Sequence, residues 1–328
     1  MTASCKICQN TEGNRFHEPR EMTFGFRDRF TYLECGRCGC LQILEFPRDM
    51  EKYYGQGYYS LAPHGALKVF VRRKWSAHAW GSKNLVGWLF TEFFFSHRSM
   101  LAVARVRPAK TARILDLGCG RGNLLCDMSW LGFQDLTGAD PFLPQDLNYE
   151  NGVRILKRDL RDVPGLFDLI MLHHSFEHVA NPAEVMKQVA ERLAPGGKVI
   201  LGIPVASSYA WKHYGVNWAN LDAPRHFFLH TQKSVELLAQ QAGLRIEQVV
   251  HEGNDEQFWL SEQYARDIPS VDSRSLKATP LKSLLALPTI RRCRAKAREV
   301  NERKEGDLVC FHLLKQEEAF GKQSTRKG

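Results

Sequence analysis

The stretch ILDLGCGRG, Ile114 to Gly122, decides the fold, because an apolar run leads directly into three closely spaced glycines. A short apolar run of this kind is typical of a buried strand. Gly118, Gly120 and Gly122 then let the backbone turn sharply and approach a ligand closely. The spacing lacks the lysine of the phosphate loop G-x-x-x-x-G-K-S/T and the third glycine of the dinucleotide fingerprint. We therefore predict a strand, a ligand-contacting turn and a helix beginning near Asn123.

Strands and helices alternate around this stretch, from Ala112 onward. Further apolar runs follow it in the order DLTGAD, VRILKRDL, FDLIMLHH, KVILGIPV, LRIEQVV and DLVCFHLLK. Segments with apolar residues at three- and four-residue spacing lie between them, for example PAEVMKQVAERLAP. Alternating strands and helices are typical of a parallel sheet covered on both faces. We therefore predict an α/β domain over residues 112–317.

Aspartates stand where two of these strands end. Asp140 ends the second strand, about twenty residues after the glycine loop, where an acid can accept hydrogen bonds from both ribose hydroxyls of an adenosine ligand. Asp159 follows the third strand and is placed to accept from an exocyclic amine. Ligands of open α/β sheets bind beyond the carboxyl ends of the strands, where all these residues lie. A helix cap is the alternative role for either aspartate.

Together, these motifs resemble class I S-adenosylmethionine-dependent methyltransferases. The resemblance covers roughly Ala112 to Gln316 and rests on DLGCGRG, GADP, RDL, FDLIMLHHSFEHVANP and LAPGGKVILGIP. It implies a Rossmann-like, seven-stranded, doubly wound and mostly parallel sheet that binds S-adenosylmethionine. The implied cofactor-binding residues are Asp116, Gly118, Cys119 and Gly120 near the methionine end, Asp140 and Pro141 at the ribose, Asp159 and Leu160 at the adenine, and His173 in the cofactor wall.

A later run, NWANLDAPRHFFLHT from Asn217 to Thr231, is similar to bacterial members of the family in cell-surface polysaccharide and sugar pathways. In those members a W-x-x-L-D-x-P-R-H run faces the substrate. The implied substrate-binding residues are Trp218, Asp222, Arg225 and His226. The resemblance implies methyl transfer to a small metabolite or glycan, first of all to a sugar hydroxyl (nucleotide-linked, lipid-linked or polysaccharide). The acceptor and the methylated atom (oxygen, carbon or nitrogen) stay open.

The segment HHSFEHVANP, residues 173–182, carries the H-x-x-E-H spacing of a metalloprotease helix read in reverse. FDLIML before it is a strand, and Asn181-Pro182 favours the start of the next helix, so His174 and His178 do not share one helix face. We therefore favour acid–base chemistry, for which histidine titrates in the right range. His178 is the first candidate base, with Glu177 to orient it or to hydrogen-bond the cofactor, and His226 is the second. A purely structural role for His178 is the alternative.

Two C-x-x-C pairs, Cys5 with Cys8 and Cys35 with Cys38, predict a structural Zn²⁺ held by four thiolates in a module over residues 1–50. A redox pair or free thiols are the alternatives. The family resemblance agrees, because such methyltransferases carry an N-terminal zinc module and then a tyrosine-rich lid. By that resemblance Tyr54 and Tyr59 of YYGQGYY contact the cofactor. Ordinary aromatic packing is the alternative for this stretch.

The formal charge of +9 is concentrated between residues 66 and 113, which hold ten basic residues and one acid. We predict a lid and a basic, amphipathic helical cap over residues 51–111. Such a patch attracts phosphates of nucleic acids, lipid headgroups or sugar nucleotides, so residues 66–113 are a candidate contact with an anionic membrane surface. A solvated helix face is the alternative. Residues 318–328 are predicted to be disordered.

The chain shows no apolar stretch long enough for a membrane helix and no signal-peptide layout at its start. We therefore expect a cytoplasmic protein, with a peripheral place at the inner membrane face as an option. RNA methylation is less favoured, because no N-P-P-Y/F motif follows the fourth strand. The alternative hypothesis from another class of protein is a non-catalytic module that binds a partner or a membrane surface.

Overall fold

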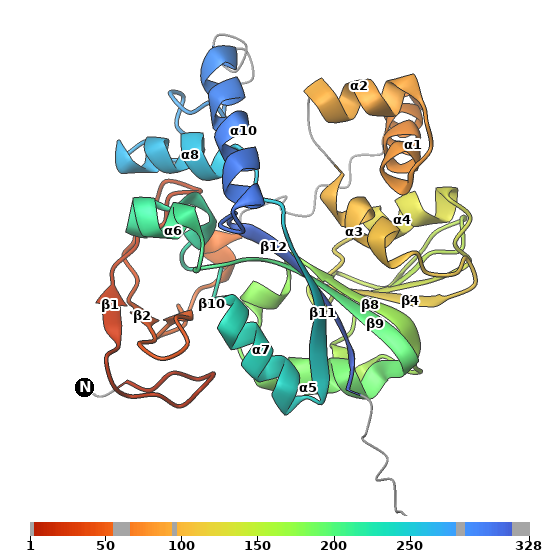
Figure 1. The fold of residues 1–328 in the computed structure, drawn as a ribbon, viewed down its shortest axis with the longest axis horizontal. Coiled ribbons are helices and arrows are strands. Elements are labelled where there is room, and N and C mark those ends of the chain that lie inside the picture. The colour runs from red at the N-terminus through yellow and green to blue at the C-terminus, as the bar shows by residue number, and fades with distance from the viewer. Residues whose placement is uncertain (1–2, 55–65, 94–96, 280–285, 317–328) are drawn as a thin grey trace, which may run out of the picture.

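The computed structural model describes residues 3–54, 66–93, 97–279 and 286–316. Tyr59 and the predicted disordered tail lie outside these residues. The central sheet has the strand order β11-β12-β9-β8-β4-β5-β7-β6 (Figure 1). Its strands are β4 Arg113–Leu117, β5 Asp135–Ala139, β6 Leu147–Asn148, β7 Arg154–Leu156, β8 Phe167–His173, β9 Leu193–Pro204, β11 Leu244–His251 and β12 Leu308–Lys315.

The sheet is mixed. Strands β4, β5, β7, β8 and β9 run parallel, whereas β12 is antiparallel to β9 and β11, and β6 is antiparallel to β7. All seven predicted strands are present. In the described residues the central sheet has one strand more than predicted, because the two-residue β6 adds an edge that its short polar sequence does not signal.

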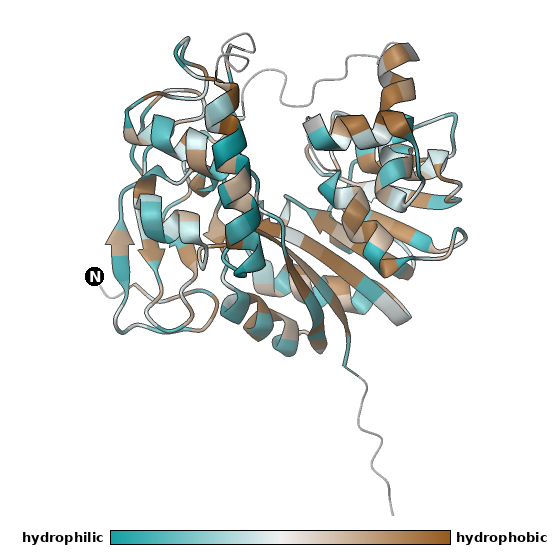
Figure 2. Cartoon of the chain, turned by 45° about the horizontal axis from the view of Figure 1, so that its top comes forward, coloured by the Kyte–Doolittle hydropathy of each residue, from teal (hydrophilic) through white to brown (hydrophobic). Residues whose placement is uncertain are grey.

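Helices cover both faces of the sheet, as predicted. Side chains alternate along each strand, so Leu115 and Ile170 pack with α5 (Pro182–Arg192) and α7 (Gln232–Gln241). Ile114, Leu169 and Met171 point the other way and pack with α3 (Arg98–Val106) and α4 (Asn123–Trp130). Figure 2 shows the resulting brown strands between helices of mixed polarity.

The N-terminal module forms a second sheet, with the order β1-β2-β3-β10. Its strands are β1 Arg15–His17, β2 Tyr32–Glu34, β3 Leu41–Ile43 and β10 Phe228–Leu229. Strand β10 follows the Pro-Arg-His triplet of the predicted substrate run and pairs antiparallel with β3. The module is therefore hydrogen-bonded to the predicted substrate run itself, across the predicted boundary at residue 50.

The remaining helices stand beyond the carboxyl ends of the strands. They are η1 Glu51–Tyr53, α1 Ala66–Trp80, α2 Leu85–Phe93, η2 Leu160–Asp162, η3 Phe176–His178, α6 Tyr209–Tyr214, η4 Gly215–Asn217, η5 Ala219–Leu221, α8 Glu256–Ala265 and α10 Leu287–Glu302. α1 and α2 pack against each other and expose several large apolar side chains, namely Leu67, Phe70, Leu85, Trp88 and Leu89. Among the described residues, no helix has both the length and the apolar character needed to cross a membrane.

Candidate functional site

The glycine loop after β4 has the tight geometry that its sequence predicts. Gly118, Gly120 and Gly122 all have positive φ angles, a region that residues with a side chain rarely adopt. A Cβ on Gly118 would lie 2.4 Å from Cβ of Ser175, in the loop after β8. The loop is therefore drawn against the start of the HHSFEH segment, and only glycine fits between them.

Asp140 holds this loop in place. Its buried carboxylate accepts hydrogen bonds from the backbone N–H of Gly120 (3.0 Å) and of Phe142 (3.0 Å), one on each oxygen. A carboxylate oxygen has a second lone pair, so both oxygens can still accept from ligand hydroxyls. Asp159 has two roles at once. It accepts from the backbone N–H of Arg161 as the cap of η2, and it lies at the wall of the same cavity.

A cavity of about 850 Å³ opens beyond the carboxyl ends of β4, β5, β7 and β8. Most of the predicted cofactor residues in the described chain line it, namely Tyr54, Gly118, Cys119, Gly120, Asp140, Pro141, Asp159 and Leu160, and the candidate base His178 lines it too. His174 lines it rather than His173, whose ring lies next to Gly202 of β9. The strand alternation explains this, because β8 ends at His173 and His174 turns out of the sheet with a φ of 53°.

Two further polar residues at the cavity wall were missed by the sequence predictions. Arg72 reaches it from α1 and donates to both carboxylate oxygens of the buried Asp127 on α4 (2.7 and 2.9 Å). Tyr149 donates to the carbonyl of Arg121 in the glycine loop (2.8 Å). The basic pattern of residues 66–113 signalled a charged helix, but nothing in it marked Arg72 as the residue that turns inward.

Asp116 lies beneath the loop and is buried. Burial, together with the charge of Asp140, raises the pKa of its carboxyl group to about 8. The carboxyl group of Asp116 is therefore largely protonated at neutral pH.

Asp116→Asn is expected to make stability less sensitive to pH. The folded state binds the Asp116 proton more tightly than the unfolded chain, so its stabilising contribution is complete below pH 4 and is lost as the pH rises toward 8. The loss is at most about 1.4 kcal/mol per pH unit. Denaturant unfolding at pH 5 and pH 8 should show that the free energy of unfolding of the variant increases relative to that of the wild type as pH rises. The exposed Asp162→Asn is the control, and parallel profiles for Asp116→Asn and wild type would contradict the prediction.

The loop after β8 and the substrate run are bound to each other through backbone groups. The N–H of Phe227 donates to the carbonyl of Glu177 (2.8 Å), and Nδ1 of His178 lies 2.8 Å from the carbonyl oxygen of Arg225. Nδ1 of His226 lies 2.8 Å from the carbonyl of Asn220. The rings of His178 and His226 meet edge to face at 4.8 Å between centroids. His178 caps no helix by its side chain, because α5 begins after Asn181 without a side-chain cap.

Burial and neighbouring charges strongly change the pKa values of Glu177 and His226. Glu177 is only 1% exposed, which would raise its pKa, but the neighbouring imidazoles of His174, His178 and His226 hold the pKa at about 2. Burial lowers the pKa of His226 to about 4. A buried, ionised Glu177 thus lies beside a neutral His226 at neutral pH.

The other predicted substrate residues lie behind the cavity wall. Trp218 is buried in the core and donates from Nε1 to Asp307 (3.0 Å). Burial would raise the pKa of Asp222, but the guanidinium of Arg225, which is bonded to it, lowers the pKa to about 2. Thr23 of the N-terminal module also donates to Asp222 (2.8 Å). Among the residues that the structure describes, none of Trp218, Asp222, Arg225 and His226 lines the cavity.

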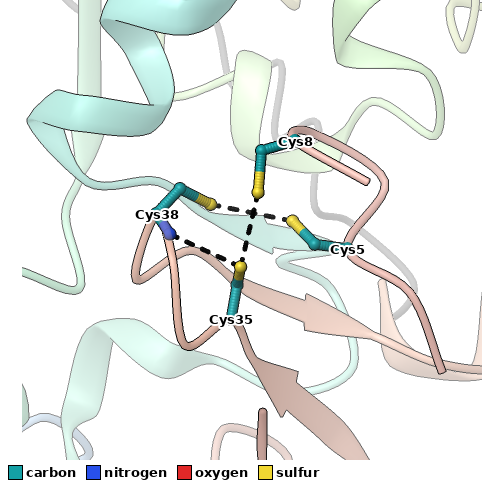
Figure 3. A group of neighbouring side chains, drawn as sticks. All are labelled: Cys5, Cys8, Cys35 and Cys38. Carbon is teal, nitrogen blue, oxygen red and sulfur yellow. Dashed lines mark hydrogen bonds between the residues drawn. The ribbon is translucent and has the colours of Figure 1, made fainter. Parts of the chain in front are cut away.

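The four predicted metal ligands converge from two loops (Figure 3). Sγ of Cys5 lies 3.7 Å from Sγ of Cys38, and Sγ of Cys8 lies 3.5 Å from Sγ of Cys35. Thiolates about 2.3 Å from a tetrahedral zinc ion lie about 3.8 Å apart, so the group fits this metal. All four sulfur atoms lie within 4.8 Å of one another.

Both cysteine loops share one backbone pattern. The carbonyl of the first cysteine accepts from the residue four positions on, Gln9 or Gly39, and each of these has a positive φ angle. Backbone N–H groups also point at the sulfurs of Cys5 and Cys35, at 3.4 Å. Such N–H groups stabilise negative charge on sulfur, as a thiolate metal site requires.

Comparison with known proteins identifies the α/β domain. Residues 94–249 match the family described as "Methyltransferase domain". The ubiquinone biosynthesis O-methyltransferase of Xanthomonas axonopodis pv. citri is 32% identical over 162 residues, which are 44% of this chain and 67% of the relative. The chain belongs to the class I S-adenosylmethionine-dependent methyltransferases.

Other known proteins match this methyltransferase over a shorter part of its length or with lower sequence identity. A tRNA U34 carboxymethyltransferase of Pseudoalteromonas translucida is 31% identical over 106 residues, which are 29% of this chain and 33% of the relative. A solved S-adenosylmethionine-dependent methyltransferase of Archaeoglobus fulgidus is 18% identical with a TM-score of 0.41, covering 70% of this chain and 99% of that one. The chain spans between about a third and two thirds of the length of the curated relatives it matches.

The cavity of this methyltransferase suits its cofactor, S-adenosylmethionine, which is a nucleoside joined to an amino acid. Its volume lies within the range of small-molecule sites. Asp140, Asp159, the glycine loop, His174 and His178 all line the cavity.

Proposed function

We propose that this methyltransferase methylates a hydroxyl oxygen of a small acceptor, with sugars and glycans as the first acceptors to test. The observation that carries the proposal is the position of His178. It lines the cofactor cavity, and its loop is in contact with the glycine loop through Ser175 and Gly118. A group able to take a proton thus borders the cofactor.

The residues fit an in-line displacement. In our assignment Asp140 and Pro141 bind the ribose, Asp159 and Leu160 bind the adenine, and Gly118 to Gly120 bind the methionine end. An acceptor hydroxyl becomes a good nucleophile when its proton is removed. A backbone carbonyl can only accept a hydrogen bond, so Nδ1 of His178 carries the proton and its Nε2 is the free basic atom. Positioning of the two reactants supplies much of the remaining acceleration.

The choice of a sugar rests on the resemblance of the W-x-x-L-D-x-P-R-H run and of the four-cysteine module. The buried Asp222–Arg225 pair serves in this proposal to hold the run, with His226 at its end. A second candidate acceptor is a phenol of a quinone precursor. Two observations favour it: the printed name of the Xanthomonas relative, and apolar side chains of Trp130, Phe142 and Val185 at the cavity wall.

We retain two other hypotheses, namely RNA as the acceptor and contact with an anionic membrane surface. RNA is included because one relative is named as a tRNA carboxymethyltransferase. Contact of α1 and α2 with an anionic membrane surface remains a prediction, supported by their exposed apolar side chains next to Arg73 and Lys74. It would bring a lipid-linked acceptor to the cavity.

His178→Ala is expected to bind S-adenosylmethionine normally and to lose methyl transfer by about a hundredfold or more, the usual contribution of a general base. The acceptor is found first with methyl-labelled cofactor across sugar nucleotides, glycans, quinone precursors and RNA, and product mass and linkage identify the methylated atom. His251→Ala is a matched control. Nδ1 of His251 also lies near a backbone carbonyl, but His251 belongs to β11 at the edge of the sheet. Full turnover of His178→Ala would end the assignment.

A further inference from the structure

Glu177, His178 and His226 bring three metal-ligating side chains together next to the cofactor cavity, of which His178 forms part of the wall. One ligand atom of each lies within 4.8 Å of the others, and Nε2 of His226 lies 3.9 Å from Oε1 of Glu177. Two ligands of a tetrahedral ion about 2.1 Å away lie about 3.4 Å apart. A modest inward movement of the side chains would therefore place all three on one ion.

Both histidines are held in the orientation that metal ligands need. Nδ1 of each ring lies 2.8 Å from a backbone carbonyl, of Arg225 for His178 and of Asn220 for His226. Since a carbonyl only accepts, both Nδ1 atoms carry hydrogen, and both Nε2 atoms present a lone pair. Metal-bound histidines typically donate their other ring N–H to such a partner. Asp222 also lies near Nε2 of His226 (3.7 Å), but its carboxylate is bonded to Arg225 and Thr23.

The carboxylate of Glu177 supplies an independent sign of a missing partner. It is 1% exposed, and within the described part of the chain neither of its oxygens has a hydrogen bond. Its nearest basic atom is Nδ1 of His174 at 3.6 Å, beyond hydrogen-bond distance, on a side chain that is 55% exposed. A buried carboxylate whose oxygens accept no hydrogen bond is costly, and coordination to a cation removes that cost.

We propose that Glu177, His178 and His226 bind a divalent metal ion of the zinc type next to the cofactor cavity, on the side that His178 lines. Two histidines and one carboxylate are a ligand set of catalytic zinc sites, which keep an open position for water or substrate. The ligand set differs from the H-x-x-E-H spacing of the sequence, because His226 comes from the substrate run and replaces His174.

This site rests on the proposed methylation of a hydroxyl oxygen and deepens it, with His178 as a metal ligand in place of the general base. The acceptor hydroxyl oxygen would occupy the open position, where the ion lowers its pKa, and its proton would pass to solvent water. An oxygen lone pair then forms the new C–O bond to the methyl carbon. The C–S bond breaks, its electron pair stays on sulfur, and S-adenosylhomocysteine is released as a neutral thioether. In this arrangement His178 and His226 hold the ion and take no proton.

The test measures metal binding without any acceptor. The full-length protein is loaded with Co²⁺ or Zn²⁺, and we expect two equivalents per chain. In the cobalt form, only the four-cysteine site should show thiolate charge-transfer absorption. Glu177→Gln and His226→Ala should each lower the stoichiometry to one, with the thiolate bands and S-adenosylmethionine affinity retained. Retention of both shows that these variants are folded.

Two further variants define the ligand set. His251→Ala, the control far along the sheet edge, should keep two equivalents, and so should His174→Ala. One equivalent in the wild type, or loss of the second ion in His174→Ala but not in His226→Ala, would overturn the site. Failure of the acceptor screen alone would instead count against the proposed function, because metal stoichiometry is measured independently of turnover.

Discussion

Asp140→Ala is expected to weaken S-adenosylmethionine binding by about a hundredfold or more, since each of two hydrogen bonds to a charged group contributes about 1.5–3 kcal/mol. Asp140 also accepts from the N–H groups of Gly120 and Phe142, so its loss loosens the loop that contacts the cofactor. Isothermal titration calorimetry on the purified protein measures the change directly. The fold should survive, because the side chain follows the end of β5 and lies outside the two hydrophobic clusters that flank the central sheet.

Two further variants test whether the loss of affinity is specific to the carboxylate of Asp140. Asp140→Asn keeps one oxygen but presents an amide N–H₂ either to Gly120 or to Phe142, so it should also bind weakly. Asp162→Ala removes an exposed acid from η2, near the adenine end, and should leave the affinity unchanged. Undiminished affinity in Asp140→Ala would remove the ribose assignment, and an equal loss in Asp162→Ala would point to a general effect of local charge.

The cofactor side of the site could be predicted from sequence because its signals are local. Gly118, Gly120, Asp140 and Asp159 each follow directly after a recognisable strand, and parallel strands bring their carboxyl ends to one edge. The strands themselves were readable as apolar runs that end in glycine or aspartate. Among the described strands of the central sheet, β6 alone was missed, since two residues paired at an edge leave no periodic pattern.

The acceptor side could not be predicted in the same way, because it depends on contacts between distant segments. Glu177 and His226 are separated by 48 intervening residues, and their meeting is set by the bond from Phe227 to Glu177. The sequence identified both as candidates but gave no reason to place them within ligand distance of one ion. Arg72 was missed for a related reason. Its inward direction follows from Asp127 on a different helix.

Cys35→Ser is expected to abolish one metal site and, with it, methyl transfer. Structural zinc contributes about 10–16 kcal/mol in small zinc peptides, so the free energy of unfolding of the module should fall by several kcal/mol. The module also holds the acceptor side of the site. Tyr32 donates to the carbonyl of His226 (2.7 Å), and Thr231 donates to the carbonyl of Cys38 (2.6 Å). Loss of the ion should therefore release His226.

Cys40→Ala is the matched control, because Cys40 is buried at the end of the same loop but is not one of the four converging cysteines. It should keep the thiolate charge-transfer absorption of the cobalt form and most of the methyl-transfer rate. Cys35→Ser should lose that absorption, and its S-adenosylmethionine affinity should fall much less than its turnover, since the cofactor residues follow β4, β5 and β7. Full thiolate absorption in Cys35→Ser would contradict the four-cysteine site. Equal loss of cofactor affinity and turnover would instead show that the module supports the whole domain and not His226 in particular.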